Sequence, residues 1–178
     1  MFTETTTYTT SPTPGETKLI KKEPLNRIYL AAPFFDDMPG TIDGQQDRID
    51  SVKAYLELNA TTGYVYSPLE HQSKEVFDSS KWRTETFNAD IRHIASSDAV
   101  VAVMAYNENG SIDDGVAFEV GMAYALNIPV IFVEQEHEGF PTNLMLSESG
   151  TAFVDEALEL LTYDFNNLNP IKYEGPIL

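Results

Sequence analysis

The sequence has no cysteine and little histidine. The missing thiols exclude disulfide bonds, thiolate nucleophiles and thiolate metal sites. The three histidines, His71, His93 and His137, stand at spacings that match no metal motif, and we expect His71 and His93 to be surface residues. No stretch approaches the roughly 20 apolar residues of a membrane span, and residues 1–18 do not resemble a signal peptide. We therefore expect a cytoplasmic protein that binds no metal and no membrane.

Positive charge is also scarce. The chain has 11 Lys and Arg against 28 Asp and Glu, a formal net charge of -17. Such a surface repels phosphate backbones and anionic lipids, so nucleic-acid polymers and membrane surfaces are poor candidate partners. Much of this acidity serves solubility. Small neutral ligands remain possible partners.

The length of 178 residues suits one α/β domain with a substantial core. Residues 1–26 are rich in Thr, Ser and Pro and have little to bury, so we predict a flexible N-terminal tail. Residues 27–178 are predicted to form a single folded domain. No internal repeat is present.

Two kinds of apolar pattern alternate along the folded part. Short apolar runs predict buried strands over residues 28–32, 64–66, 98–104 and 129–133. Helical spacing of apolar residues predicts helices over residues 44–58, 81–95, 115–126 and 154–161, the last with Val154, Leu158 and Leu161 on one face. This alternation predicts an α/β fold: a doubly wound parallel sheet of about five strands, flavodoxin- or Rossmann-like, flanked by helices. Ligands of such sheets lie beyond the carboxyl ends of the strands.

Two acidic residues fall on faces that should be apolar. Asp90 lies within the apolar stripe of the helix predicted over 81–95, and Glu119 within that of the helix predicted over 115–126. Burying an unpaired carboxylate costs several kcal/mol, and basic partners are few in this chain. The two acids therefore either line a cleft or reach solvent from the edge of their stripes. The acidic, Gly-rich loop before the second helix favours the cleft.

The segment DDGVAFEVGMA (113–123) explains how such a cleft is built. Asp113 or Asp114 can cap the helix by accepting its free N–H groups, and Gly115 lets a ligand approach the backbone closely. Gly121 and Ala123 are expected to pack tightly against the sheet. Clustered acids also bind metals, but no histidine stands nearby, so we disfavour a metal site.

Six segments, taken in order, resemble one known family. They are RIYLAAPFF (27–35), YSPLEHQ (66–72), NAD (88–90), DxGxxxExGxA (113–123), NLM (143–145) and YEGPIL (173–178). Each is weak alone, but six at matching separations form a specific signal. The chain resembles the nucleoside 2-deoxyribosyltransferases over nearly all of 27–178.

The resemblance implies a role for each of four side chains. Glu119 matches the family's nucleophile, and Tyr29 matches the tyrosine that positions it. Asp90 and Asp113 match two aspartates that contact the nucleobase, one of which protonates the departing ring. By this resemblance the enzyme moves deoxyribose between bases by a retaining double displacement through a covalent deoxyribosyl-Glu119 intermediate. That chemistry requires no metal and no organic cofactor.

Further residues match the family's substrate contacts. Gln72 matches a glutamine near the base pocket, and Phe34 and Phe35 match an aromatic pair that closes over the base. Phe34 stands where one well-known member has Trp, and Pro33 where that member has Gly. These departures leave the preference for purines or pyrimidines open.

Other matching residues imply a site shared between subunits. Asn143 and Met145 match residues that reach into a neighbouring subunit's site, where the asparagine binds the sugar's 5′-hydroxyl. The carboxylate of Leu178 matches a terminus that also approaches a site. The resemblance thus implies deoxynucleosides and free nucleobases as partners, and a homohexamer built from dimers.

Two alternatives remain open. The first is a nucleoside or deoxynucleoside 5′-monophosphate N-hydrolase, which shares the fold and the Glu nucleophile but needs phosphate donors near the 5′ position. The second is a non-catalytic nucleotide-binding sensor on the same doubly wound fold.

Overall fold

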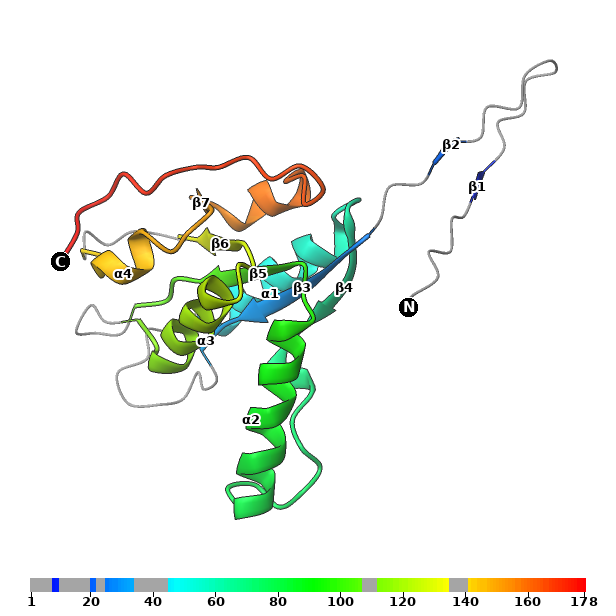
Figure 1. The fold of residues 1–178 in the computed structure, drawn as a ribbon, viewed down its shortest axis with the longest axis vertical. Helices are drawn as coiled ribbons and strands as arrows, with labels where there is room; N and C mark the ends of the chain where they lie inside the picture. The colour runs from blue at the N-terminus through cyan, green and yellow to red at the C-terminus, as the bar shows by residue number, and fades with distance from the viewer. Residues whose placement is uncertain (1–7, 10–19, 22–24, 34–44, 107–111, 135–140) are drawn as a thin grey trace.

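The computed structural model describes residues 8–9, 20–21, 25–33, 45–106, 112–134 and 141–178. Within these ranges a five-stranded, all-parallel sheet forms the centre of the molecule, in the order β4-β3-β5-β6-β7 (Figure 1). Its strands are β3 (Asn26–Ala31), β4 (Thr62–Tyr66), β5 (Ala99–Val103), β6 (Val130–Val133) and β7 (Ala152–Val154). This confirms the predicted doubly wound α/β sheet.

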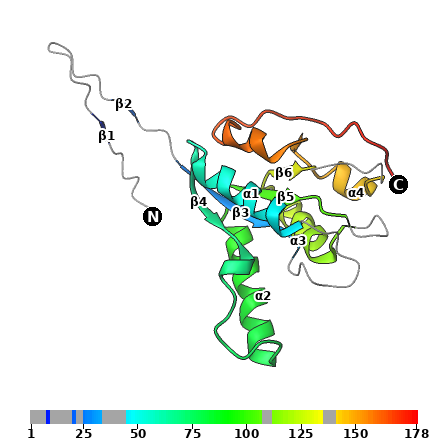
Figure 2. The same ribbon diagram turned by 180° about the vertical axis from the view of Figure 1, so that it is seen from behind.

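Helices cover both faces of the sheet. The α-helices are α1 (Gln45–Leu58), α2 (Ser80–Ala95), α3 (Asp114–Ala125) and α4 (Leu144–Ser147), and the 3-10 helices are η1 (Pro68–Glu70) and η2 (Ala157–Leu161). Helix α1 and η2 pack on one face, whereas α3 and the end of α2 pack on the other, as Figures 1 and 2 show from opposite sides. The N-terminal half of α2 projects away from the sheet in both views.

The alternation of side chains along the strands divides the core in two. In β3, Ile28 and Leu30 pack with α1, whereas Tyr29 and Ala31 face α2 and α3. Successive strand residues point to opposite faces of the sheet, so the alternation along β3 places the Tyr29 side chain on the face that α3 covers. All four of these residues are fully buried.

The strand order places the chain's reversal between β3 and β5. From β3 the chain passes to β4 on one side of it, and β5 then lies on the other side. In doubly wound sheets the carboxyl edge beside such a reversal is where ligands bind. In this protein that edge is followed by η1 after β4 and by α3 after β5.

The C-terminal helix prediction is wrong. Residues 152–154 form β7, paired in parallel with β6, and a 3-10 turn begins only at Ala157. The side chain of Leu158 is 53% exposed and so does not belong to the inward face assigned to it. Glu156 and Glu159 form a capping box, which starts the turn after the strand has ended.

Most of the predicted tail, residues 1–26, lies outside the described residues. Two short strands within it, β1 (Tyr8–Thr9) and β2 (Ile20–Lys21), pair antiparallel, and β3 begins at Asn26. Among the described helices, none combines the length and apolar character that crossing a bilayer requires.

Candidate active site

A carboxylate and a phenol form the centre of the site. The Tyr29 hydroxyl donates a 2.5 Å hydrogen bond to Glu119 Oε1. Tyr29 is fully buried in β3, and Glu119 is half-buried in the second turn of α3. The structure thus joins two residues that lie 90 positions apart in the sequence. This contact places Glu119 beside Tyr29, and the role of the pair is taken up as a proposal below.

A second carboxylate–phenol pair lies next to the first. The Tyr66 hydroxyl, at the end of β4, donates a 3.0 Å hydrogen bond to Asp90 Oδ1 on α2. Tyr66 is the register partner of Tyr29, and their rings stack with centroids 5.5 Å apart. Adjacent strands therefore supply two phenols side by side, and each phenol holds one carboxylate.

Burial perturbs both carboxylates strongly. Burial raises the pKa of Glu119 to about 8; the Tyr29 hydrogen bond opposes this rise, and the charges of Asp90 and Asp113 add to it. Burial also raises the pKa of Asp90 to about 6, against the lowering effect of the Tyr66 hydrogen bond. Both shifts favour the neutral acid because a carboxylate loses hydration when it is buried. Carboxyl groups with such pKa values are suited to proton transfer near neutral pH.

Asp113 caps helix α3, as one of the two alternatives predicted. Its Oδ1 accepts hydrogen bonds from the backbone N–H groups of Gly115 at 2.8 Å and Val116 at 3.0 Å. A Cβ at Gly115 would lie 2.9 Å from this oxygen, so the glycine makes room for the cap. From this position Asp113 acts on Glu119 through its charge.

The expected packing of Gly121 is wrong. Gly121 is exposed, and a Cβ built there would meet nothing within 4 Å. Ala123, two residues later, is fully buried against the sheet as predicted. Residues two positions apart on an α-helix point about 200° apart, so Gly121 faces solvent when Ala123 faces the sheet.

The predicted base-pocket residues are only partly described. Phe34 and Phe35 lie outside the described residues. Gln72 is half-buried after η1, and its Nε2 donates a 3.4 Å hydrogen bond to the Leu69 carbonyl oxygen. The structure therefore places Gln72 at the predicted edge of the sheet, beyond the end of β4.

Asn143, Met145 and Leu178 gather in a different place. The three residues line a cavity of about 360 Å³ beside the N-terminal end of α3, whose lining contains neither Glu119 nor Tyr29. Asn143 caps α4, with its Oδ1 accepting a 2.9 Å hydrogen bond from the Met145 N–H. Met145 is 76% and Leu178 75% exposed. These predicted site residues are thus close to one another but point outward.

A hydrogen-bond chain holds the C-terminal segment in this position. Thr142 Oγ1 bonds to the hydroxyls of Tyr106 at 2.7 Å and Tyr173 at 2.9 Å. The backbone N–H of Leu178 donates to the Thr142 carbonyl oxygen at 2.9 Å. The terminus is therefore fixed beside the loop that carries Asn143.

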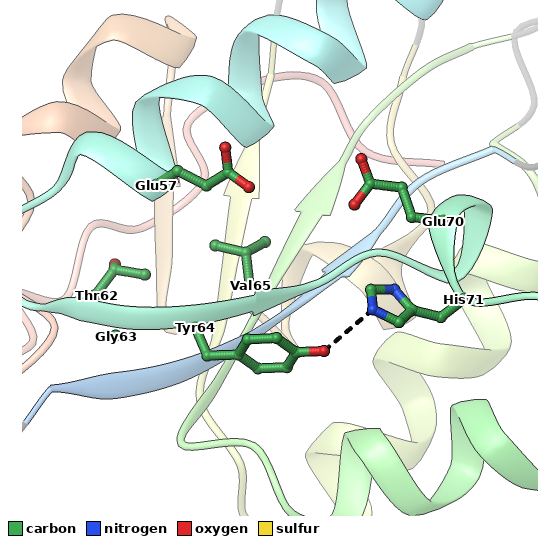
Figure 3. A pocket seen from close by; sticks show the side chains of 7 residues that line it. All are labelled: Glu57, Thr62, Gly63, Tyr64, Val65, Glu70 and His71. Carbon is green, nitrogen blue, oxygen red and sulfur yellow. Dashed lines mark hydrogen bonds between the residues drawn. The ribbon is translucent and has the colours of Figure 1, made fainter.

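A further pocket, of about 360 Å³, lies along the edge strand β4 (Figure 3). Glu57 of α1 and Glu70 of η1 line it, and Lys53 bridges them at 2.5 and 3.2 Å. Its rim includes His71, which hydrogen-bonds the Tyr64 hydroxyl at 3.3 Å in the same view. In the described part of the chain, no group of three or more acidic or histidine side chains is arranged to hold a metal ion.

Sequence reasoning assigned no role to three residues near the site. Tyr66 holds Asp90, and the imidazoles of His71 and His93 stack on the Tyr66 ring. His71 is exposed, as expected, but His93 is half-buried. The available signal was the position of Tyr66 at the carboxyl end of a strand, where a polar side chain reaches the ligand edge.

Comparisons with known proteins identify the family of the chain. The sequence model of the nucleoside 2-deoxyribosyltransferase family matches residues 28–151. A nucleoside deoxyribosyltransferase of Limosilactobacillus fermentum is 31% identical, over 84% of this chain and 91% of that protein. One from Lactobacillus leichmannii is 27% identical, over 86% of this chain and 99% of that protein. The solved structure of a 2-deoxyribosyltransferase from Bacillus psychrosaccharolyticus is 33% identical, with a TM-score of 0.68, over 83% of this chain and 98% of that chain.

The two carboxylates of this site are bound by phenols at the ligand edge of a doubly wound sheet. Together with these relatives, this arrangement defines an α/β enzyme of the pentosyltransferase class. Within that class, the chain belongs to the nucleoside 2-deoxyribosyltransferase family.

Proposed function

We propose that the protein exchanges the nucleobase of 2′-deoxynucleosides, with Glu119 as the nucleophile. The observation that carries this proposal is the hydrogen bond between the buried Tyr29 and the half-buried Glu119 at the carboxyl edge of the sheet. A carboxylate held there can stabilise, and then bond to, the oxocarbenium-like carbon that forms when an N-glycosidic bond breaks.

The reaction proceeds in two displacements at C1′. Tyr29 binds Oε1, so Oε2 of Glu119 attacks C1′ while the C1′–N bond breaks and its electron pair leaves with the base. A carboxylic acid, Asp90 or Asp113, gives its proton to the departing ring. The second base then attacks C1′, the ester bond to Glu119 breaks, and the proton of the incoming base passes back to the acid. Two inversions give net retention.

The two perturbed carboxyls share one proton at neutral pH. Their pKa values of about 6 for Asp90 and about 8 for Glu119 place this proton mainly on Glu119. The reactive state, with a charged Glu119 and a protonated Asp90, is the minor arrangement of the same proton, and the Tyr29 hydrogen bond raises its share by favouring the ionised form of Glu119. That state can attack and protonate at once.

We further propose that Asn143, Met145 and Leu178 serve the site of a neighbouring subunit in a hexamer built from dimers. All three are exposed and line a cavity that lacks the nucleophile. The test is subunit mixing. Glu119→Ala and Asn143→Ala chains, each inactive alone, should regain activity together, because some mixed sites combine an intact nucleophile with an intact Asn143. Light scattering of the wild-type protein measures the number of subunits.

Acceptor dependence tests the function itself. The protein is incubated with deoxyadenosine, alone and with cytosine or another purine base, and products are separated by chromatography. We expect sustained release of adenine, and the deoxynucleoside of the added base, only when an acceptor is present. Free deoxyribose released equally fast with and without an acceptor would instead support an N-hydrolase.

The covalent step is tested separately. Quenching the enzyme with deoxyadenosine and no acceptor should leave a deoxyribosyl adduct on the peptide that contains Glu119, detected by mass spectrometry. Glu119→Ala should form no adduct and exchange no bases. Exchange at the wild-type rate in that variant would remove Glu119 from the mechanism.

A further inference from the structure

Three aromatic rings surround Tyr66. The His93 ring stacks on it with centroids 3.7 Å apart and planes 11° apart. The His71 ring lies at 4.7 Å and 30°, and the Tyr29 ring at 5.5 Å and 25°. Tyr66 itself is 2% exposed. The phenol that binds Asp90 is therefore confined by its neighbours.

His71 is held by hydrogen bonds at both ring nitrogens. Its Nδ1 lies 2.9 Å from the Ser67 carbonyl oxygen, which can only accept, so Nδ1 carries the proton. In the neutral ring Nε2 then accepts from the Tyr64 hydroxyl at 3.3 Å (Figure 3). These two contacts fix the plane of the imidazole against Tyr66.

His93 connects Tyr66 to the helix that carries Asp90. Asp90 and His93 lie three positions apart on α2, so they occupy the same helix face in successive turns. The helix thus presents both a carboxylate to the Tyr66 hydroxyl and an imidazole to the Tyr66 ring. A ring held at this face cannot swing its hydroxyl away from Asp90 without losing the stack.

We propose that His93 and His71 are positioning residues, which hold Tyr66 so that its hydroxyl keeps Asp90 oriented toward the base that Glu119 displaces. The inference rests on the proposed function for the role of Asp90, and on the ring contacts for the part played by the histidines. Neither histidine contacts the reacting atoms in this arrangement; both act through Tyr66.

Burial and neighbouring positive charges keep the His93 ring neutral at physiological pH. The pKa of His93 is lowered by burial first, and then by the charges of Arg27, His71 and Arg92. The pKa of Tyr66 is raised by burial, by Asp90 and by Tyr64, and Arg92 opposes this rise. The contact between His93 and Tyr66 is therefore a stack of two uncharged rings.

The first test removes only the hydroxyl. In Tyr66→Phe the ring and its stacking remain, but the hydrogen bond that lowers the pKa of Asp90 is lost. The titration midpoint of Asp90 is measured by carbon-13 NMR of its carboxyl resonance, which the Asp90→Asn variant assigns, and it should move to higher pH. Tyr163→Phe is the matched control, because it removes a phenol hydrogen bond to the Asn169 carbonyl oxygen on the opposite face of the sheet. This control should leave the Asp90 midpoint unchanged.

The second test separates stacking from folding at His93. We expect His93→Ala to lower kcat about tenfold with little change in KM, and His93→Phe, which restores a stacking ring, to recover most of the loss. In the Tyr66→Phe background, His93→Ala should lower kcat less than about twofold, because the contact through which it acts is already gone. Thermal denaturation of each variant checks the fold.

Several results would overturn the inference. An Asp90 midpoint that does not move in Tyr66→Phe, a His93→Phe variant as slow as His93→Ala, or additive losses in the double variant would each do so. If the wild-type protein exchanges no bases, the proposed function fails instead. The inference is then decided by NMR alone, since the Tyr66 Cζ resonance should shift in His93→Ala and keep its wild-type position in His93→Phe.

Discussion

Tyr29 and Glu119 link the central sheet to helix α3 through one hydrogen bond of 2.5 Å. The phenol is fully buried, so it has no alternative partner in solvent, and it binds one oxygen of a half-buried carboxylate. The bond offsets part of the cost of ionising Glu119 in a sheltered place.

Removing the Tyr29 hydroxyl should slow the reaction and shift its pH dependence. In Tyr29→Phe, Glu119 loses the hydrogen bond that lowers its pKa, so ionisation requires a higher pH. We expect kcat to fall about 10- to 100-fold, and the alkaline limb of the kcat/KM profile, which the pKa of Glu119 sets, to move toward higher pH. Steady-state kinetics from pH 5 to 10 measure both, with Tyr163→Phe as control. An unmoved limb would show that the bond does not tune Glu119.

The wild-type enzyme should have a bell-shaped profile of kcat/KM. Below a pH of about 6 both carboxyls of the Asp90–Glu119 pair are protonated, and above a pH of about 8 both are ionised. Only the singly protonated pair supplies both a nucleophile and an acid, so the rate should fall about tenfold per pH unit on either side. A rate constant from pH 5 to 10 would contradict this role for the pair.

Glu119 should destabilise the fold as pH rises. Its pKa is raised by folding to about 8, so the folded state holds this proton more tightly than the unfolded state does. Between the ordinary glutamate pKa and about 8, the free energy of unfolding therefore falls with increasing pH.

Glu119→Gln removes this effect and keeps a carbonyl oxygen for Tyr29. We expect the variant to exceed the wild type by about 1–3 kcal/mol at pH 9 and to match it at pH 4, measured by urea denaturation. The exposed Glu148→Gln serves as control. A constant difference at both pH values would refute the linkage.

Asp113 contributes both a cap and a charge, and two variants separate them. Asp113→Asn keeps the cap acceptor, so stability should stay near wild type, while loss of the charge lowers the pKa of Glu119 and shifts the alkaline limb downward. Asp113→Ala removes both and should cost about 1 kcal/mol in addition. Equal stabilities of the two variants would show that the cap is energetically unimportant.

Two glycines should respond oppositely to alanine. At Gly150 a Cβ would lie 2.3 and 2.6 Å from the buried Phe153 ring, so Gly150→Ala should destabilise by about 1–3 kcal/mol. At Gly121 nothing lies within 4 Å, and alanine is the better helix former, so Gly121→Ala should stabilise by about 0.5–1 kcal/mol. Denaturation midpoints of the two variants provide the comparison, and a loss of stability in Gly121→Ala would contradict the observed exposure.

Local pattern was sufficient for much of the fold and for singling out the two acids on apolar helix faces. Buried strands such as β5 are continuous apolar runs, and an acid such as Glu119 stands out because it interrupts an apolar helix face. The cap at Asp113 also follows from near neighbours alone. Features of this kind depend on contacts within a few residues, so periodicity and residue type predict them.

Contacts between distant segments decided the rest. Residues 152–154 became a strand because β6 offered an unpaired edge, which no helical spacing within the segment reveals. The register of β3 on β4 put Tyr66 beside Tyr29, and helix packing brought His93 onto its ring. The sequence determined which residues carry charge, rings and hydroxyls. Their pairing depended on strand order and helix placement, because these are set by the burial of the whole core rather than by any one segment.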